Sequence, residues 1–172
     1  MRTVRVVQLS AEALRALADG DLVAAQRAAP VPLSRWFVSA DSRVLWRRRA
    51  TQVVQTPDDL AWVTGVIVDD VSGQAVGAGG FHAAPTSDGM VEAGYRIDPD
   101  FRRRGYARST LRTLIARAQA DPAVVVLRLT IAPDNEPSLA LARQFPFVKV
   151  GEQWDDEDGL EDIYEMPVVS TP

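Results

Sequence analysis

The spacing of apolar residues divides the chain into segments of strand and helix character. Short runs rich in Val, Ile, Leu and Phe predict strands, at about 4–9, 60–68, 74–81, 91–97, 124–131, 147–154 and 160–166. Apolar residues at three- and four-residue intervals, together with capping residues, predict helices at about 10–18, 22–29, 33–50, 107–118 and from 135 onward. The predicted order is a strand, three helices, three strands, a helix, a strand, a helix and two strands.

The segment 124–131 differs from the other predicted strands because it is almost continuously apolar. Such runs are typical of strands that are covered on both faces. We therefore predict burial of this strand on both sides of the sheet.

Composition narrows the classes of protein to which the chain can belong. Its 172 residues with 47% hydrophobic content suit one domain, which we place at 1–172. The absence of Cys and the single His exclude disulfides, thiolate nucleophiles and Cys- or His-based metal clusters. A net charge of −4 disfavours nucleic acid as a partner, and no apolar run approaches membrane-spanning length. We expect a cytoplasmic protein with neither nucleic acid nor membrane among its partners.

A basic turn follows the strand predicted at 91–97. Asp98-Pro99-Asp100 ends that strand, and Arg102-Arg103-Arg104-Gly105-Tyr106-Ala107 leads into the next helix. Such a turn directs backbone N–H groups at one point, and the helix dipole adds partial positive charge there. Gly105 lacks a Cβ, so an anion can approach the main chain closely. The segment predicts a binding site for a diphosphate.

Two common phosphate-binding patterns do not fit this turn. A Walker loop requires Gly-x-x-x-x-Gly-Lys-Ser/Thr, but Lys149 is the only lysine. A dinucleotide fingerprint requires Gly-x-Gly-x-x-Gly, which does not occur here. The pattern Arg/Gln-x-x-Gly-x-Gly/Ala is met by Arg102, Gly105 and Ala107.

Two blocks of sequence carry a resemblance to a known family. The first comprises 94–99 and 102–107, and the second comprises 124–131, Asn135, Ser138 and 145–151, with Pro146 where Gly is usual. Together they resemble the acyl-coenzyme A signature of the GNAT superfamily of N-acetyltransferases. The Ser three positions after Asn135 is most similar to the branch that acetylates ribosomal-protein N-termini. The resemblance covers roughly 60–167 well and the N-terminal third loosely.

The resemblance implies an α/β fold in which a mixed, mostly antiparallel sheet is flanked by helices. It also implies acetyl-coenzyme A as the acyl donor, without a metal, and direct transfer of the acetyl group to a primary amine in a ternary complex. The acceptor is a protein or peptide N-terminus or a small-molecule amine, and a homodimer is left open. No covalent nucleophile is evident in the sequence.

The resemblance also assigns candidate site residues. The cofactor-binding candidates are Ile97, Arg102, Arg103, Arg104, Gly105, Tyr106, Ala107, Asn135 and Ser138. Glu92 is the candidate catalytic base, acting through water, and Ser138 is the candidate donor of a proton to the leaving thiolate. Many members place a Tyr acid seven residues after the Asn, whereas this chain has Ala142.

Structural interpretations compete with several of these roles. The arginines also suit a solvated helix start, Asn135 an ordinary helix cap, and Glu92 a surface position on a sheet. His82 and Tyr164 are further candidates to reach a pocket. Trp36 is more typical of a core residue than of an acceptor contact.

Alternatives at the level of function also remain open. The acidic segment 155–162 suits attraction of a cationic amine, although polar hairpin turns are common. The protein is alternatively a sensor that binds acyl-coenzyme A without catalysis, because Ala142 removes the usual acid. A second alternative is an interaction protein whose arginines bind an acidic partner.

Overall fold

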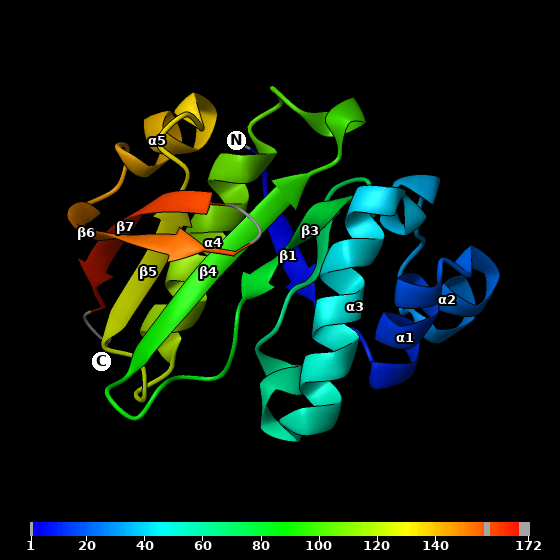
Figure 1. Ribbon diagram of the computed structural model, residues 1–172. Coiled ribbons are helices and arrows are strands. Elements are labelled where there is room, and N and C mark those ends of the chain that lie inside the picture. Colours follow the sequence, from blue (N-terminus) through cyan, green and yellow to red (C-terminus); the bar gives the residue numbers. More distant parts are fainter. Residues whose placement is uncertain (1, 157–158, 169–172) are drawn as a thin grey trace.

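The computed structural model describes residues 2–156 and 159–168 and shows one mixed α/β domain (Figure 1). Its strands are β1 (Val4–Val7), β2 (Gly65–Asp69), β3 (Ala75–Phe81), β4 (Met90–Ile97), β5 (Val126–Ile131), β6 (Val148–Asp155) and β7 (Gly159–Pro167). Its α-helices are α1 (Ala11–Asp19), α2 (Leu22–Ala28), α3 (Ala40–Gln55), α4 (Tyr106–Ala120) and α5 (Glu136–Ala142). Short 3-10 helices are η1 (Arg35–Val38), η2 (Pro57–Ala61) and η3 (Pro99–Phe101). The predicted order of strands and helices is confirmed.

The seven strands form one sheet in the order β1-β2-β3-β4-β5-β7-β6. All neighbouring pairs are antiparallel except β4 and β5. The mixed, mostly antiparallel sheet expected from the family resemblance is therefore confirmed. Among the described residues, none of the helices has the length and apolar character needed to cross a bilayer.

Helix ends follow local sequence signals. The Ser10 side chain accepts a hydrogen bond from the Ala13 N–H at the start of α1, and Gly20 ends that helix in the left-handed conformation. The Asp21 side chain caps α2 in the same way as Ser10 caps α1. These capping residues explain why the first two predicted helices have nearly the observed bounds.

Helices cover both faces of the sheet. Buried side chains of α1, α2 and α3 form one core cluster with Val66 and Val68 of β2. Ile67, on the alternate face of β2, packs instead with Tyr106 of α4. α4 and α5 share a third cluster with β4 and β5, and Figure 1 shows α4 behind these two strands. The sheet therefore separates an N-terminal helical layer from the layer that contains α4.

Two sequence predictions about strands are wrong in detail. The predicted strand 60–68 begins only at Gly65, because Pro57 starts η2 and its capping contacts extend to Trp62. β5 alternates between buried and half-buried residues, so it is not buried on both faces. Arg128 and Thr130 occupy its more open face, and both side chains have polar partners there.

The parallel pair β4 and β5 is the feature that positions the site. Their register pairs Met90 with Val126 and ends with Glu92 opposite Arg128. Beyond this point β4 continues to Ile97 and β5 to Ile131 without pairing to each other. The C-terminal halves of the two strands therefore leave an opening in the middle of the sheet.

Candidate active site

The turn before α4 forms the wall of a deep cavity. Gly105 is the N-cap of α4 with φ 84°, and no side chain caps the first turn. Arg103 is also left-handed, with φ 58°, an uncommon conformation for a residue with a Cβ. A Cβ added to Gly105 would meet nothing within 4 Å, so the backbone here faces open space. N–H groups of the first helical turn have no intrahelical acceptor and are available to an anion.

We call the space beside this turn the donor cavity, after the acyl donor that the sequence resemblance implies. It has a volume of about 640 Å³. All the cofactor-binding candidates line it except Arg104, namely Ile97, Arg102, Arg103, Gly105, Tyr106, Ala107, Asn135 and Ser138. The structure therefore brings together residues from β4, the turn, α4 and α5, and their binding role remains a prediction.

Side chains around the turn hold its shape. Arg102 Nε donates a hydrogen bond to the Ile97 carbonyl over 3.1 Å, which folds the turn back onto the end of β4. The Tyr106 hydroxyl points inward and donates to Asp69 Oδ2 over 2.8 Å. A main-chain hydrogen bond from Ser72, the Tyr106 hydroxyl and the other donors around it lower the pKa of Asp69 to about 2, although burial opposes this shift. Tyr106 therefore anchors α4 with its side chain and can offer only its main chain to a ligand.

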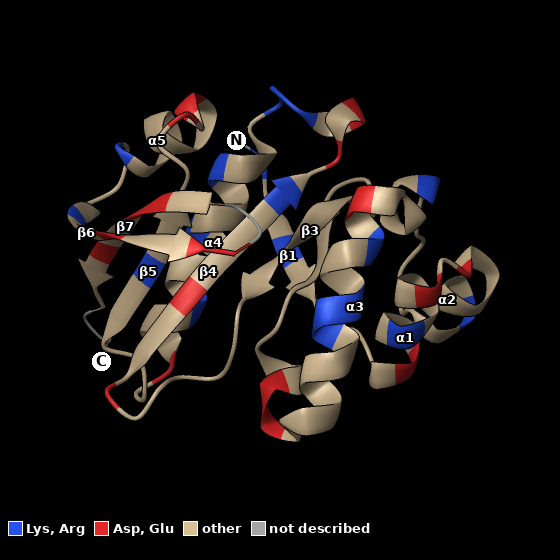
Figure 2. Ribbon diagram, in the orientation of Figure 1, with Lys and Arg blue, Asp and Glu red and all other residues tan. Residues whose placement is uncertain are grey.

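An arginine-lined hollow of about 550 Å³ adjoins the donor cavity. Arg104 lines this hollow together with Arg2, Arg108 and Arg112. Gly105 and Arg108 line both spaces. Figure 2 shows basic residues in the turn before α4 and at the start of that helix. The positive charge therefore extends beyond the turn itself.

The α5 side of the donor cavity is built around Asn135. Its Oδ1 accepts a hydrogen bond from the Ser138 N–H over 3.3 Å, so Asn135 does cap the helix. The Ser138 side chain also approaches the Tyr95 hydroxyl of β4. Burial raises the pKa of Tyr95 to about 12 although the Ser138 side chain opposes the shift, and the phenol stays protonated at neutral pH. A hydroxyl pair thus spans the opening between β4 and α5.

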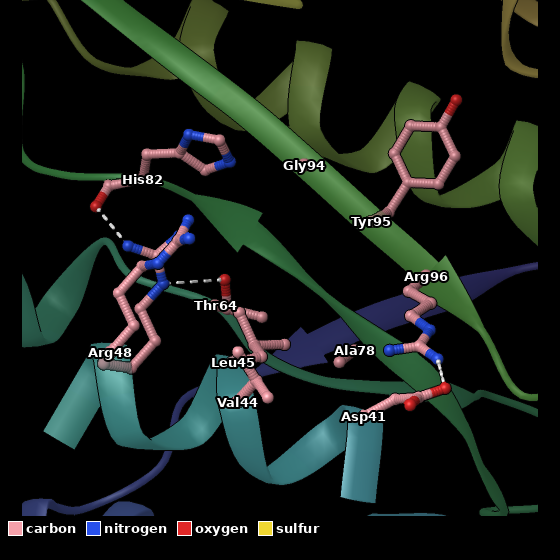
Figure 3. A pocket seen from close by; sticks show the side chains of 11 residues that line it. Asp41, Val44, Leu45, Arg48, Thr64, Ala78, His82, Gly94, Tyr95 and Arg96 are labelled. Carbon is pink, nitrogen blue, oxygen red and sulfur yellow. Dashed lines mark hydrogen bonds and ion pairs between the residues drawn. The ribbon is translucent and has the colours of Figure 1, made fainter. Parts of the chain in front are cut away.

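A second space lies on the other side of β4, and we call it the acceptor cavity, after the amine acceptor that the sequence resemblance implies (Figure 3). It has a volume of about 310 Å³. Its lining comes from α3, β3, β4, the residue before β2 and the residue after β3, and comprises Asp41, Val44, Leu45, Arg48, Arg49, Thr64, Ala78, His82, Gly94, Tyr95 and Arg96. Tyr95 and Arg96 also line the donor cavity. The two cavities therefore meet at these two residues of β4.

His82 and Glu92 form a pair at one end of the acceptor cavity. His82 Nδ1 lies 3.1 Å from Glu92 Oε1, and the same oxygen accepts a hydrogen bond from Thr130 Oγ1 over 2.7 Å. Burial favours a higher pKa for Glu92, but the interactions with His82, Thr130 and Arg128 outweigh it and lower the pKa. His82 lines the cavity, and its Nε2 lies against Gly94. Glu92 is thus an ionised partner that orients the imidazole.

The main chain of His82 is held by a buried network. Arg49 Nη1 and Gln52 Nε2 donate to the His82 carbonyl over 3.0 and 2.8 Å. Gln52 also donates to Asp59 Oδ2 over 2.6 Å, and Arg49 Nε donates to Thr64 Oγ1 over 3.3 Å. Burial, followed by the charge of Arg48, lowers the pKa of Arg49 to about 10, which leaves the guanidinium charged at neutral pH. α3 therefore fixes the position of His82.

Comparison of the sequence with protein families identifies this architecture. The family described as "Acetyltransferase (GNAT) domain" matches residues 11–148. The protein belongs to the GNAT acetyltransferases. A search of curated proteins finds no match to the sequence.

Solved structures share the GNAT fold over nearly the whole chain. RimL, a ribosomal L7/L12 α-N-protein acetyltransferase solved with coenzyme A, is 15% identical with a TM-score of 0.66, over 98% of this chain and 96% of its own. The spermidine N-acetyltransferase SpeG from Vibrio cholerae is 15% identical with a TM-score of 0.65, over 96% and 94%. The microcin C7 self-immunity acetyltransferase MccE, solved with acetyl-CoA and AMP, is 16% identical with a TM-score of 0.63, over 96% and 93%. The resemblance drawn from the sequence is confirmed.

Several candidates of this GNAT domain lie outside both cavities. The Tyr164 hydroxyl points to Asp162 on its own strand, 3.5 Å away. Trp36 packs edge-on against Phe37, consistent with its interpretation as a core residue. Ala142 is buried in the cluster around α4. The acidic segment 155–162 does not line either cavity in its described part, and Glu157 and Asp158 lie outside the described residues.

Other residues of the GNAT site were missed in the sequence. Tyr95 belongs to the motif 94–99, but only the fold shows that it separates the two cavities. Arg49 has no predicted role, because its burial is not evident from the local sequence. Within the described ranges, no three His, Cys, Asp or Glu side chains come together as a metal-binding group.

Proposed function

We propose that the protein is an N-acetyltransferase that transfers the acetyl group of acetyl-coenzyme A directly to a primary amine. The observation that carries this proposal is the meeting of two cavities at Tyr95 and Arg96, where β4 no longer pairs with β5. One cavity leads to an anion-binding helix start and the other contains an oriented histidine. A thioester bound in the first is thereby accessible to an amine bound in the second.

The donor cavity suits a molecule with several phosphates. N–H groups at the start of α4 bind the diphosphate, because Gly105 leaves the backbone uncovered. The adjoining arginine-lined hollow suits the third phosphate of coenzyme A, which lies on the ribose. The two spaces share Gly105 and Arg108, so one extended ligand can occupy both.

The acceptor amine must lose a proton during the reaction. A lysine-type amine has a pKa of about 10.4 and is mostly protonated at neutral pH. Because His82 Nδ1 lies 3.1 Å from the Glu92 carboxylate, we assign the ring proton to Nδ1, which leaves a lone pair on Nε2 at the acceptor cavity. We assign His82 as the base, acting directly or through one water, and Glu92 as the carboxylate that orients it. This modifies the role predicted for Glu92 from the sequence, in which the carboxylate itself was the base.

The bonds and protons of the acetyl transfer are all accounted for without a covalent enzyme intermediate. The acceptor ammonium first loses one proton to water. The neutral amine nitrogen then attacks the thioester carbonyl carbon and forms the C–N bond, and His82 Nε2 takes the second proton. Collapse of the tetrahedral intermediate breaks the C–S bond, and the electron pair leaves on sulfur. Ser138, which lines the donor cavity, donates a hydrogen bond to this thiolate, which takes its proton from water. A thiol with a pKa of about 8.5 needs little assistance to leave, which accommodates Ala142.

The experiment combines donor binding with a thiol-release assay. Titration calorimetry with acetyl-coenzyme A tests binding, and release of free thiol in the presence of amines and short peptides tests transfer. His82→Gln is expected to lower kcat/KM about 100-fold, and Glu92→Gln about tenfold, with donor affinity unchanged.

Glu161→Gln is the matched control, because this carboxylate on β7 bonds Gln153 outside both cavities. Donor binding without turnover of any amine would instead favour the acyl-coenzyme A sensor. Absence of donor binding at physiological salt would favour a protein that binds an acidic partner.

A further inference from the structure

The acceptor cavity carries an excess of positive charge. Three of its lining residues are arginines, Arg48, Arg49 and Arg96, whereas Asp41 is its one lining carboxylate within the described parts of the chain. Asp41 is also engaged, because Arg96 Nη2 donates to its Oδ2 over 3.0 Å. Since Arg guanidinium groups stay charged at neutral pH, the field in this cavity favours anions.

Charges just outside the lining do not reverse this balance. Glu92 lies behind His82, and its carboxylate is directed at His82 and Thr130. Asp59 accepts hydrogen bonds from Gln52 and the Ala84 N–H over 2.6 and 2.8 Å. These two carboxylates offset the formal charge of the lining, but neither of them lines the cavity, so the charged groups that a ligand meets there are mainly guanidinium groups.

The basic groups are separated along the cavity. Figure 3 shows His82 and Arg48 toward one end and Arg96 with Asp41 toward the other, with Thr64, Leu45 and Ala78 between them. Arg96 is held in place by Asp41 and by the Trp36 ring, whose centroid is 5.8 Å from the Arg96 guanidinium carbon. An acceptor whose amine lies at His82 thus has guanidinium groups both near its amine and farther along its body.

The dimensions of the cavity suit a small-molecule acceptor. Its volume of about 310 Å³ is at the lower end of the range for small-molecule pockets. A polyamine gains no favourable electrostatic interaction with this lining, because its second ammonium group would face arginines. A compound with an oxyanion a few bonds from its amine gains charge-assisted hydrogen bonds.

We propose that the acceptor is a small primary amine that also carries a carboxylate or phosphate, and that the guanidinium groups of Arg48, Arg49 and Arg96 select it. This inference rests on the proposed acetyltransferase function and names the substrate class of the same site. It excludes polyamines such as spermidine as preferred acceptors, although one structural neighbour is titled a spermidine N-acetyltransferase.

Matched pairs of amines test the proposal. β-Alanine is compared with propylamine, and O-phosphoethanolamine with ethanolamine, each with saturating acetyl-coenzyme A in the thiol-release assay at low salt. The anionic member of at least one pair is expected to have a kcat/KM about tenfold higher than its neutral partner. The first pair tests a carboxylate and the second a phosphate, and the ratio should fall as salt rises because charges near the surface are screened.

Variants of α3 test the residues. Arg48→Met is expected to lower the ratio of anionic to neutral acceptor about fivefold, and Arg48→Glu to lower it further. Arg47→Met is the matched control, because Arg47 is an exposed neighbour on α3 that lines other surface hollows. Because Arg48 is exposed as well, both variants are expected to fold, which circular dichroism checks.

The outcomes separate this inference from the proposed function. Turnover of propylamine, ethanolamine or spermidine at a kcat/KM equal to or above that of both anionic amines would overturn the acceptor assignment and leave the acetyltransferase function intact. An unchanged ratio in both Arg48 variants would also overturn it. Donor binding without turnover of any amine would overturn the proposed function, and this inference with it.

Discussion

Gly94→Ala offers a narrow test of the role of His82, because it changes one contact in the acceptor cavity. A Cβ added at Gly94 would lie 2.7 Å from His82 Nε2, and the other atoms nearest to it, at 3.5 and 3.8 Å, also belong to the His82 ring. Ordinary contacts begin at 3.4 Å, so the ring must withdraw by about 0.7 Å. The ring is held at 3.1 Å from Glu92, and a displacement of this size disrupts that geometry.

The magnitude follows from the role proposed for the imidazole. A misplacement approaching 1 Å at a reacting group costs about 100-fold, which corresponds to about 2.7 kcal/mol in the activation free energy. Stability should change by less than about 1 kcal/mol, because an alanine within a strand is slightly better than a glycine and the new contact is with a movable side chain. We therefore expect kcat/KM for the best acceptor to fall about 100-fold with an unchanged unfolding midpoint.

The assay is thiol release at saturating acetyl-coenzyme A, with thermal unfolding measured in parallel. Gly151→Ala on β6 is the control, because its added Cβ would meet only Ile163 Cδ1 at 3.9 Å. The donor KM should stay constant, since Gly94 does not line the donor cavity. A kcat/KM within twofold of the unsubstituted protein would refute the assignment of His82 as the base.

Three further predictions concern the donor side and the core. Gly105→Val should raise the donor KM at least about tenfold, whereas Gly73→Val, also at a left-handed glycine with open space around it, should leave it unchanged in steady-state assays. Dephospho-coenzyme A, which lacks the third phosphate, should bind about fivefold more weakly than coenzyme A by calorimetry. Equal affinities would show that the arginine-lined hollow does not contribute to donor binding. Asp69→Asn should lower the free energy of unfolding by about 2 kcal/mol at pH 7. Because the pKa of Asp69 is lowered from 3.8 to about 2, the advantage of the unsubstituted protein is fully present above about pH 4 and should disappear as pH falls toward 2, as urea unfolding can measure.

The order of the elements and the turn before α4 could be predicted from the sequence because both depend on local signals. Ser10, Gly20 and the 102–107 motif act within a few residues, through capping and backbone conformation. The donor cavity assembled from the motif residues is therefore close to what the sequence predicts.

The acceptor cavity was harder to predict from the sequence because it depends on contacts between distant segments. Arg49 reaches the His82 carbonyl across 33 positions, and Thr130 reaches Glu92 across 38. No local sequence pattern predicts such contacts. The sequence therefore indicated His82 only as a further candidate and assigned no role to Tyr95. The error at 60–64 has a similar origin, because Asp59 at the base of η2 is held by Gln52 of α3 and the Ala84 N–H.

The two cavities draw on different layers of the molecule, and this has a consequence for protein engineering. The donor cavity is built from β4, the turn, α4 and α5, whereas Asp41, Val44 and Arg48 contribute to the acceptor cavity from the exposed surface of α3. Because these three side chains contribute little to the core, α3 can, under the proposed function, be redesigned for new amines without changing the cavity proposed to bind acetyl-coenzyme A. A library confined to one helical surface would then explore substrate scope while the rest of the scaffold stays constant.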